Sequence, residues 1–237
     1  MDSVPFWVGG VTSKTISSAP YFAASYETKA RSYFDRVRAD FVCRLPADPG
    51  ASILEIGCGT GATGALALKR RRAGRYVGVE LFEGAASAAR DVLSEVVVGD
   101  VETLEFDWQP AEFDVLILSE VLEHLREPWD TLKRLARFIR PGGVVLASSP
   151  NVSHWRVIRE LVSGRFPLAD QGVFDSTHIR WFTPETFVEM FYRAGFEVDR
   201  VQPVTPFSLR TQLLSRLTDG RFDHLFMTQI AIEGHKR

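Results

Sequence analysis

The sequence has few of the features that mark several protein classes. Among its 237 residues are only two cysteines, Cys43 and Cys58, and they form no C-x-x-C pair. A disulfide framework or a zinc knuckle is therefore not indicated. No apolar run reaches about 18 residues, so the sequence predicts no membrane-spanning helix. The chain starts with Asp2 and no basic segment, which is not typical of a secretory signal, and we expect a cytoplasmic protein.

The sequence also lacks an excess of charge of either sign. Its formal net charge is -2, which gives no electrostatic reason to expect nucleic acid or an anionic membrane as a partner. Hydrophobic residues make up 45% and charged residues 24%, as in ordinary globular proteins. We expect one domain over residues 1–237 that binds a small-molecule or carbohydrate substrate. The sequence leaves its oligomeric state open.

Short apolar runs alternate with helical patterns through the first two thirds of the chain. Because strands that alternate with helices favour a parallel sheet, the pattern predicts a doubly wound α/β fold. The expected strands are 52–56, 76–81, 95–98, 113–118 and 144–148, and the expected helices between them are 64–72, 84–93 and 129–139.

The two ends of the chain depart from this alternation. Residues 17–45 have helical spacing, and we expect a helical cover whose Tyr26 either touches a ligand or packs on the sheet. Residues 151–183 are rich in His, Trp, Arg and Asp and follow the fifth strand, where a substrate lid is expected. A helix over 183–194, strands over 196–201 and 226–233, and an extra helix over 206–217 complete the prediction.

The stretch SILEIGCGTGATG, residues 52–64, is an apolar strand that ends in a cluster of glycines. Such a turn lets the backbone approach a ligand closely, and the helix that follows points its first amides at it. A glycine fingerprint alone is weak evidence. Glu80, about twenty residues further on, supports an adenosine ligand because its carboxylate can accept both ribose hydroxyls.

Two acidic residues favour S-adenosylmethionine over a nicotinamide dinucleotide. Glu55 lies inside the apolar strand, and burying a carboxylate is costly unless it is paired. The ammonium of S-adenosylmethionine offers such pairing, whereas a pyrophosphate would be repelled. Asp100 follows the third strand, where it can accept from the adenine amino group. The chain also has no Tyr-x-x-x-Lys pair for hydride chemistry, so an oxidoreductase is the weaker alternative.

Five segments in this order, LEIGCGTG, GVEL, GDVE, FDVLILSEVLEHL and LARFIRPGGVVLASSPN, resemble the class I S-adenosylmethionine-dependent methyltransferases. The match covers roughly residues 50–150. The resemblance implies an enzyme with a Rossmann-like, doubly wound, seven-stranded sheet whose last strand is antiparallel. It implies a cofactor site made of Glu55, Gly57, Gly59, Gly61, Glu80, Asp100, Val101 and Ser119.

The expected lid carries side chains suited to an acceptor. Asp175 could orient His178 as a general base, and Arg180 and Trp155 could hold a substrate, although each could instead pack or cap the lid. The phrase G-x-F-D-x-T-H-x-R-x-F-T resembles a subgroup from bacterial sugar-polymer and cell-envelope pathways. We therefore expect O-methylation of a sugar hydroxyl, with His178 or His154 as the base.

A second resemblance points to another acceptor. Glu120, Glu123 and His124 match positions linked to a magnesium ion in ubiquinone-pathway O-methyltransferases, and carboxylates three residues apart on a helix share one face. The alternative is thus O-methylation of a phenol or quinol, with or without magnesium, with His124 otherwise structural or on the substrate side. An alternative of another class is a cofactor-binding partner protein with little catalysis.

Overall fold

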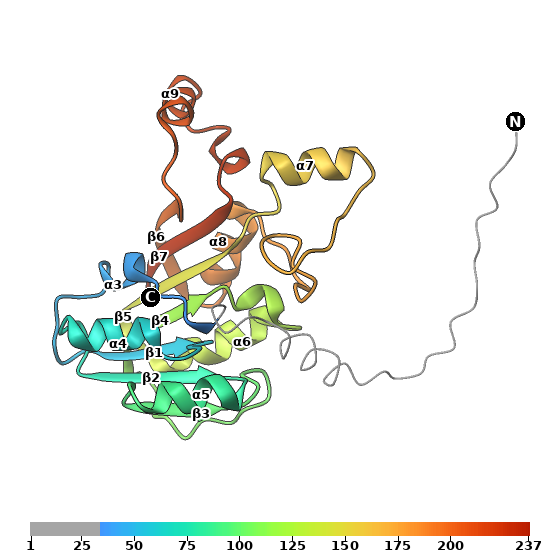
Figure 1. Ribbon diagram of the computed structural model, residues 1–237. Helices are drawn as coiled ribbons and strands as arrows, with labels where there is room; N and C mark the ends of the chain where they lie inside the picture. Colours follow the sequence, from blue (N-terminus) through green and yellow to red (C-terminus); the bar gives the residue numbers. More distant parts are fainter. Residues whose placement is uncertain (1–33) are drawn as a thin grey trace, which may run out of the picture.

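The fold is built on one twisted sheet. The computed structural model describes residues 34–237, and Tyr26 and most of the expected helical cover lie outside them. Seven strands form the sheet in the order β3-β2-β1-β4-β5-β7-β6 (Figure 1). They are β1 (Ser52–Ile56), β2 (Arg75–Glu80), β3 (Glu95–Val98), β4 (Phe113–Ser119), β5 (Ile139–Pro150), β6 (Phe196–Pro203) and β7 (Gln229–Lys236).

The pairing directions place the carboxyl ends of five strands at one edge. Strands β1 to β5 pair in parallel, and β7 runs antiparallel to both β5 and β6. The order reverses between β1 and β4, and ligands of open α/β sheets bind in the crevice at such a switch point. The predicted seven-stranded fold with an antiparallel last strand is confirmed.

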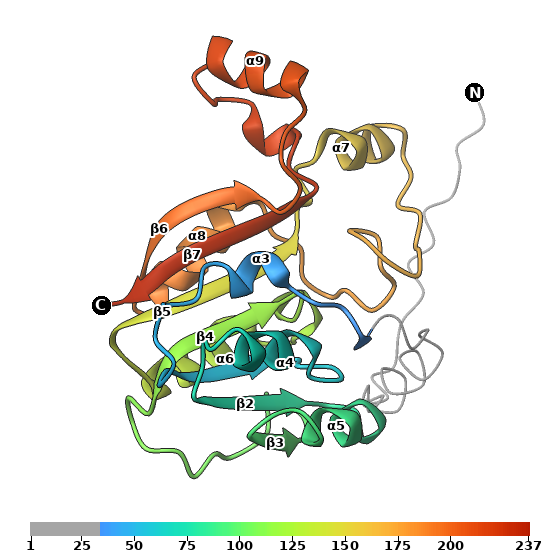
Figure 2. The ribbon, with the colours of Figure 1, turned by 60° about the vertical axis from the view of Figure 1, so that its left-hand side comes forward.

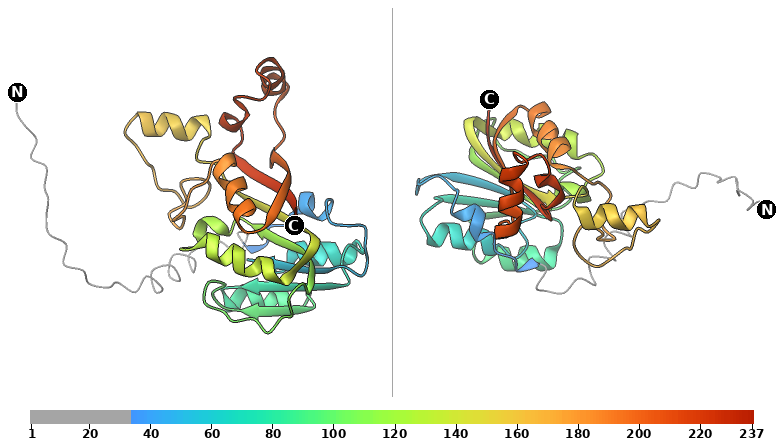
Figure 3. Two further views of the ribbon diagram at one scale, coloured as in Figure 1. Left: turned by 180° about the vertical axis from the view of Figure 1, so that it is seen from behind. Right: turned by 90° about the horizontal axis from the view of Figure 1, so that it is seen from above.

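Helices cover both faces of the sheet because most of its strands are apolar on both sides. On one face lie α3 (Ala39–Val42), α4 (Ala62–Lys69) and α5 (Glu83–Arg90) (Figure 2). On the other lie α6 (Pro128–Leu135) and α8 (Pro184–Arg193), seen from behind in Figure 3. Each face has its own buried cluster. Tyr76 belongs to the first, and Phe187 and Phe191 belong to the second.

Local signals explain where helix α8 begins and ends. The Thr183 hydroxyl accepts a hydrogen bond from the Thr186 amide, and the Thr186 hydroxyl accepts one from the Thr183 amide. The two bonds form a capping box. Pro184 fills the first helical position, where its missing amide costs nothing. Gly195 follows the helix with a φ of 93°, the left-handed conformation that glycine tolerates.

The structure differs from the sequence prediction in two places that matter for the site. Of the helical cover expected over 17–45, residues 34–45 are described: Phe34 is helical, residues 36–38 are not, and Ala39–Val42 form the four-residue helix α3. The expected lid contains a helix, α7 (Trp155–Val162), followed by a long loop. Its ends are held together because Asn151 bridges Phe182.

Two segments project from the sheet edge. Figure 1 shows α7 with its loop, and the expected extra helix α9 (Leu209–Leu217), standing away from the main body. No residue of α9 is buried, and Leu209 and Leu217 are 84% and 76% exposed. No helix within residues 34–237 is long and apolar enough to cross a membrane.

Candidate functional site

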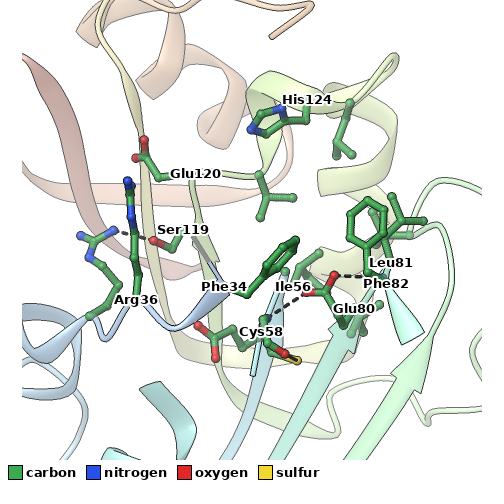
Figure 4. Close-up of a pocket in the computed structure, with 18 of the residues that line it drawn as sticks. Phe34, Arg36, Ile56, Cys58, Glu80, Leu81, Phe82, Ser119, Glu120 and His124 are labelled. Atoms are coloured by element: carbon green, nitrogen blue, oxygen red, sulfur yellow. Dashed lines mark hydrogen bonds between the residues drawn. The ribbon is translucent and has the colours of Figure 1, made fainter. Parts of the chain in front are cut away.

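A cavity of about 830 Å³ opens at the carboxyl ends of β1, β2 and β4, next to the switch point (Figure 4). This volume lies within the usual range of small-molecule sites, roughly 300–1,000 Å³. Residues from the glycine turn, from the segment before α3 and from the lid all line it. Those expected from the sequence are Glu55, Gly57, Gly59, Glu80, Asp100, Val101, Ser119, Glu120, His124, Asp175 and His178.

The glycine turn is locked to the end of β2. Glu80 is buried, and its two carboxylate oxygens accept the amides of Gly59 at 2.8 Å and Phe82 at 3.0 Å. A Cβ on Gly59 would come within 2.4 Å of the Phe34 carbonyl oxygen, and its φ is 55°. Glycine is therefore required there, and the carboxylate of Glu80 is held in place with lone pairs left for a ligand.

The buried carboxylate of Glu55 lies below the turn. It accepts a 2.8 Å hydrogen bond from the hydroxyl of Tyr76, itself fully buried. Burial raises the pKa of Glu55 to about 8, against the lowering effects of Tyr76 and Arg38. A carboxylate in this setting favours a cation beside it, because the charged form lacks solvation.

A guanidinium that the sequence analysis did not identify lies beside these acids. Arg38 donates from Nη1 to the hydroxyls of Ser119 and Ser148, both at 2.6 Å, and pairs with both oxygens of Asp40. Its guanidinium also sits 3.6 Å from the centre of the Phe41 ring. Arg38 therefore adds a fixed positive charge at the ends of β4 and β5. Its helical spacing alone could not separate it from the solvated arginines of the same segment.

Three further residues of the expected cofactor set have distinct places. Asp100 lines the cavity and accepts the Glu102 amide at 2.9 Å, which fixes the loop after β3, while Val101 is buried beside it. Gly61 does not line the cavity. A Cβ there would meet Val92 at 2.9 Å and Ala89 at 3.2 Å, so this glycine serves the packing of α4 against α5.

Two histidines from different segments meet on the lid side of the cavity. His124 belongs to the 3₁₀ helix η1 (Leu122–His124), and its ring lies 4.7 Å from that of His178 in the lid. The Nδ1 of His124 contacts the Thr177 carbonyl at 3.2 Å, and the Nδ1 of His178 contacts the Val173 carbonyl at 3.3 Å. Because a carbonyl only accepts, we assign the proton to each Nδ1 and the lone pair to each Nε2.

The expected pairing of Asp175 with His178 stays a prediction. Asp175 is buried and lines the same cavity, and its Oδ1 accepts both the amide and the hydroxyl of Thr177, at 3.0 and 2.7 Å. Its carbonyl accepts the His178 amide at 3.0 Å, so the two residues share one turn. Asp175 thus shapes the loop that presents His178.

The other lid residues named from the sequence lie away from the cavity lining. His154 begins α7, where its Nδ1 accepts the Arg156 amide at 3.3 Å, a capping role that disfavours it as the base. Trp155 is 39% exposed on the same helix. Arg180 donates to the Arg126 carbonyl and lies 5.7 Å from the Trp129 ring, so it ties the lid to the segment after η1.

The expected magnesium set of Glu120, Glu123 and His124 stays a prediction. Glu120 has a φ of 56° and precedes η1, so it shares no helical face with Glu123. It accepts from Gln229 at 2.9 Å, whereas Glu123 accepts from Ser149 at 3.2 Å. Within residues 34–237, the carboxylate and imidazole groups close enough to hold a metal are those of Glu123, His124 and His178. This group contains His178 and does not contain Glu120.

Comparison with known proteins gives one family and one fold. Residues 26–201 match the family model described as a methyltransferase domain. A ubiquinone biosynthesis O-methyltransferase of Aromatoleum aromaticum is 28% identical over 87% of this chain and 89% of its own length. A trans-aconitate 2-methyltransferase of Azoarcus is 33% identical, over 49% of this chain and 46% of its own length.

Solved structures resemble the chain in fold at low sequence identity. One described as a SAM dependent methyltransferase, from Archaeoglobus fulgidus, superposes with a TM-score of 0.60 at 19% identity. The match covers 91% of this chain and 99% of that one. At this level of identity the likeness shows the fold.

Proposed function

We propose that this chain, which belongs to the methyltransferase-domain family and is an S-adenosylmethionine-dependent methyltransferase, methylates a hydroxyl group of a small molecule. The observation that carries the proposal is the pair of imidazoles, His124 and His178, that line the same cavity as the cofactor residues. A hydroxyl acceptor needs such groups because its proton must leave as the methyl arrives.

The residues of the cavity fit the cofactor at each of its polar ends. The Glu80 carboxylate suits the two ribose hydroxyls of the adenosyl group, and Gly57 and Gly59 line the cavity next to it. Glu55 and Arg38 supply a negative and a positive charge, which complement the ammonium and carboxylate of a methionyl group. When bound, S-adenosylmethionine supplies a methyl group on a positively charged sulfur.

The chain's own contribution to methyl transfer is placement and activation of the acceptor. Placement alone can supply much of the rate of an in-line displacement. An imidazole at the position of His178 activates a hydroxyl in one of two ways: it takes the proton itself, or it binds an ion that lowers the pKa of the hydroxyl. A carboxylate acceptor would require neither, which makes the histidines the feature that favours a hydroxyl.

Among hydroxyl acceptors, we place a phenol or quinol first. The relative from Aromatoleum aromaticum, which aligns with 87% of this chain, acts, by its name, in ubiquinone biosynthesis. A sugar hydroxyl is the second candidate, supported by polar side chains that line the cavity, among them Gln171 and Asp175 from the lid and Gln229 from β7. A sugar presents several hydroxyls that such groups can bind.

The proposal is tested with the purified full-length chain, S-adenosylmethionine and two acceptor panels, one of catechols and simple phenols and one of sugars and nucleotide sugars. We expect release of S-adenosylhomocysteine with a catechol-type acceptor and a product heavier by one CH₂ group, located on oxygen. Methylation of a carboxylate or a nitrogen instead, with no hydroxyl turnover, would refute the assignment. Turnover confined to the second panel would move the acceptor class to carbohydrates.

A further inference from the structure

We propose that Glu102 is a positioning residue that couples the cofactor side of the cavity to the lid. Its carboxylate joins the loop after β3, residues 99–104, to residues 125–127 between η1 and α6, where the lid is attached. A cofactor bound beside Asp100 would then restrain lid residues that it does not touch. The inference rests on the cofactor site and is independent of which acceptor is methylated.

Hydrogen bonds inside the loop after β3 join Asp100 to Glu102. The Asp100 carboxylate accepts the Glu102 amide at 2.9 Å, and the Asp100 carbonyl accepts the amides of Thr103 at 3.0 Å and Leu104 at 2.9 Å. Asp100 lines the cavity. Because its carboxylate binds the backbone of Glu102, a ligand that fixes Asp100 also fixes the place from which the Glu102 side chain extends.

The carboxylate of Glu102 binds two consecutive backbone amides at the start of α6. Its Oε2 accepts the Arg126 amide at 3.1 Å, and its Oε1 accepts the Glu127 amide at 2.8 Å. Glu127 is the N-cap residue of α6, but its own side chain makes no capping bond. The helix dipole favours a carboxylate at this end, and hydrogen bonds to a charged acceptor are stronger than neutral ones. Glu102 therefore supplies the cap that the local sequence lacks.

A second contact ties the same loop to the same helix. Arg134, in the last turn of α6, donates from Nη2 to the carbonyl of Val101, which is itself buried. The loop is thus held at two consecutive residues, one bonded to the start of α6 and the other to its end. We therefore expect the loop and the helix to move together.

The lid is attached to the same peptide group that Glu102 binds. Arg180 donates from Nε to the Arg126 carbonyl at 3.0 Å, and this carbonyl shares one planar peptide group with the Glu127 amide. A rotation of that peptide group would break both hydrogen bonds. A carboxylate on its N–H and a guanidinium on its C=O also polarise it in the same sense, so each bond strengthens the other.

The connection continues into the lid through its backbone. The amides of Ile179 and Arg180 both donate to the Glu123 carbonyl, each at 3.0 Å. His178, which lines the cavity, comes directly before these two residues. The hydrogen-bonded path from the loop after β3 thus ends at the turn that presents His178.

Coupling along this path predicts an order of binding. A coupling free energy between two sites acts equally in both directions, and typical values change affinity by about 5–150-fold. The cofactor should therefore slow local opening of the lid. An acceptor held by the lid should in turn bind more tightly once the cofactor is in place.

The test is hydrogen exchange of the full-length chain, followed by mass spectrometry with and without saturating S-adenosylhomocysteine, because exchange reports local opening. We expect the ligand to slow exchange of lid residues 173–182 by about fivefold or more. In Glu102→Ala, saturated with the same ligand, the slowing should fall below about twofold. Arg180→Ala breaks the path on the lid side, leaves the loop after β3 intact and should have the same effect.

A conservative variant and a control separate coupling from folding. Glu102→Gln keeps the shape of the side chain and one acceptor oxygen but loses the charge, so its lid response should be intermediate. Glu105→Gln, three residues further along the chain, alters an exposed side chain and should leave the lid response unchanged. Thermal melting shows whether each variant is folded, and exchange of residues 209–217 in the projecting α9 serves as the internal reference.

Two results would overturn the inference. One is a lid that does not respond to S-adenosylhomocysteine in the unaltered chain that binds it. The other is a lid response of full size in folded, saturated Glu102→Ala or, where that variant cannot be saturated, in Arg180→Ala. If the unaltered chain does not bind S-adenosylhomocysteine at all, the cofactor assignment fails instead, so the two failures are distinguishable.

Discussion

The two sides of the cavity differ in how their buried acids are satisfied. On the cofactor side, Glu80 accepts two backbone amides and Glu55 accepts the Tyr76 hydroxyl. On the acceptor side, Glu123 has one oxygen without a hydrogen-bond partner within residues 34–237. The sheet therefore fixes the cofactor side through its own hydrogen bonds. The acceptor side is built by contact between η1 and the lid.

Because the two sides of the cavity are built from different contacts, mutations should be able to change methyl transfer without changing cofactor binding. The largest expected effect is that of His178→Ala on turnover, a loss of about 10²–10⁴-fold in kcat/KM, because removal of an acid–base or metal-binding group has this size. Affinity for S-adenosylhomocysteine should change less than about threefold, since His178 belongs to the lid. Steady-state kinetics and calorimetry give the two numbers. Equal losses in both would mean that the two sides are one unit.

The matching change on the cofactor side is Glu80→Ala. It removes the acceptor of the Gly59 and Phe82 amides as well as the expected ribose contact. We expect a loss of about 2–4 kcal/mol in binding of S-adenosylhomocysteine, measured by calorimetry. Glu83→Gln, three residues further on and paired with Arg90 at the surface, is the control. Unchanged affinity in Glu80→Ala would remove the basis for the cofactor assignment.

The buried carboxyl group of Glu55, on the cofactor side, should make the free energy of unfolding depend on pH. Burial raises its folded-state pKa to about 8, so the folded protein holds a proton that the unfolded chain releases above its ordinary pKa near 4.5. Its contribution to stability is complete below that ordinary value and is lost as pH rises through about 8, on the order of a few kcal/mol. Denaturant unfolding from acid to mildly alkaline pH should show this slope, and Glu55→Gln should flatten it. A slope of the same size in the variant would assign the effect elsewhere.

The smallest effect is expected in the projecting helix α9. Leu217→Ser changes a side chain that is 76% exposed, and the free energy of unfolding should move by no more than about 0.5 kcal/mol. Phe187→Ala in the buried core should cost about 3–5 kcal/mol in the same denaturation assay. A large loss in Leu217→Ser would mean that α9 packs against something that the fold of residues 34–237 does not show.

The cofactor side of the cavity could be predicted from the sequence better than the acceptor side. The strands 52–56 and 95–98 were predicted with the observed bounds, because apolar runs followed by glycine or acidic turns are local signals. The cofactor acids Glu55, Glu80 and Asp100 lie at or just beyond the ends of β1, β2 and β3, so parallel pairing brings them together without further information. The order of the motifs was therefore enough to predict the fold and most of the cofactor side of the site.

The acceptor side depends on contacts between segments distant in the chain. The spacing of Glu120 and Glu123 predicted a shared helical face, but Glu120 adopts a left-handed conformation before η1 and turns to Gln229. Nothing in the local pattern joins His124 to His178. Arg38 was missed for the same reason, because its partners Ser119 and Ser148 lie on two different strands.

The central claim is that Glu55, Glu80 and Arg38 hold an adenosyl ligand with a charged amino acid end. Calorimetric titration of the full-length chain with S-adenosylhomocysteine, with NADH in parallel, tests it most directly. We predict one site per chain for the first ligand, proton release at neutral pH as Glu55 ionises, and no comparable heat from NADH. No binding of S-adenosylhomocysteine, or tighter binding of NADH, would contradict the claim.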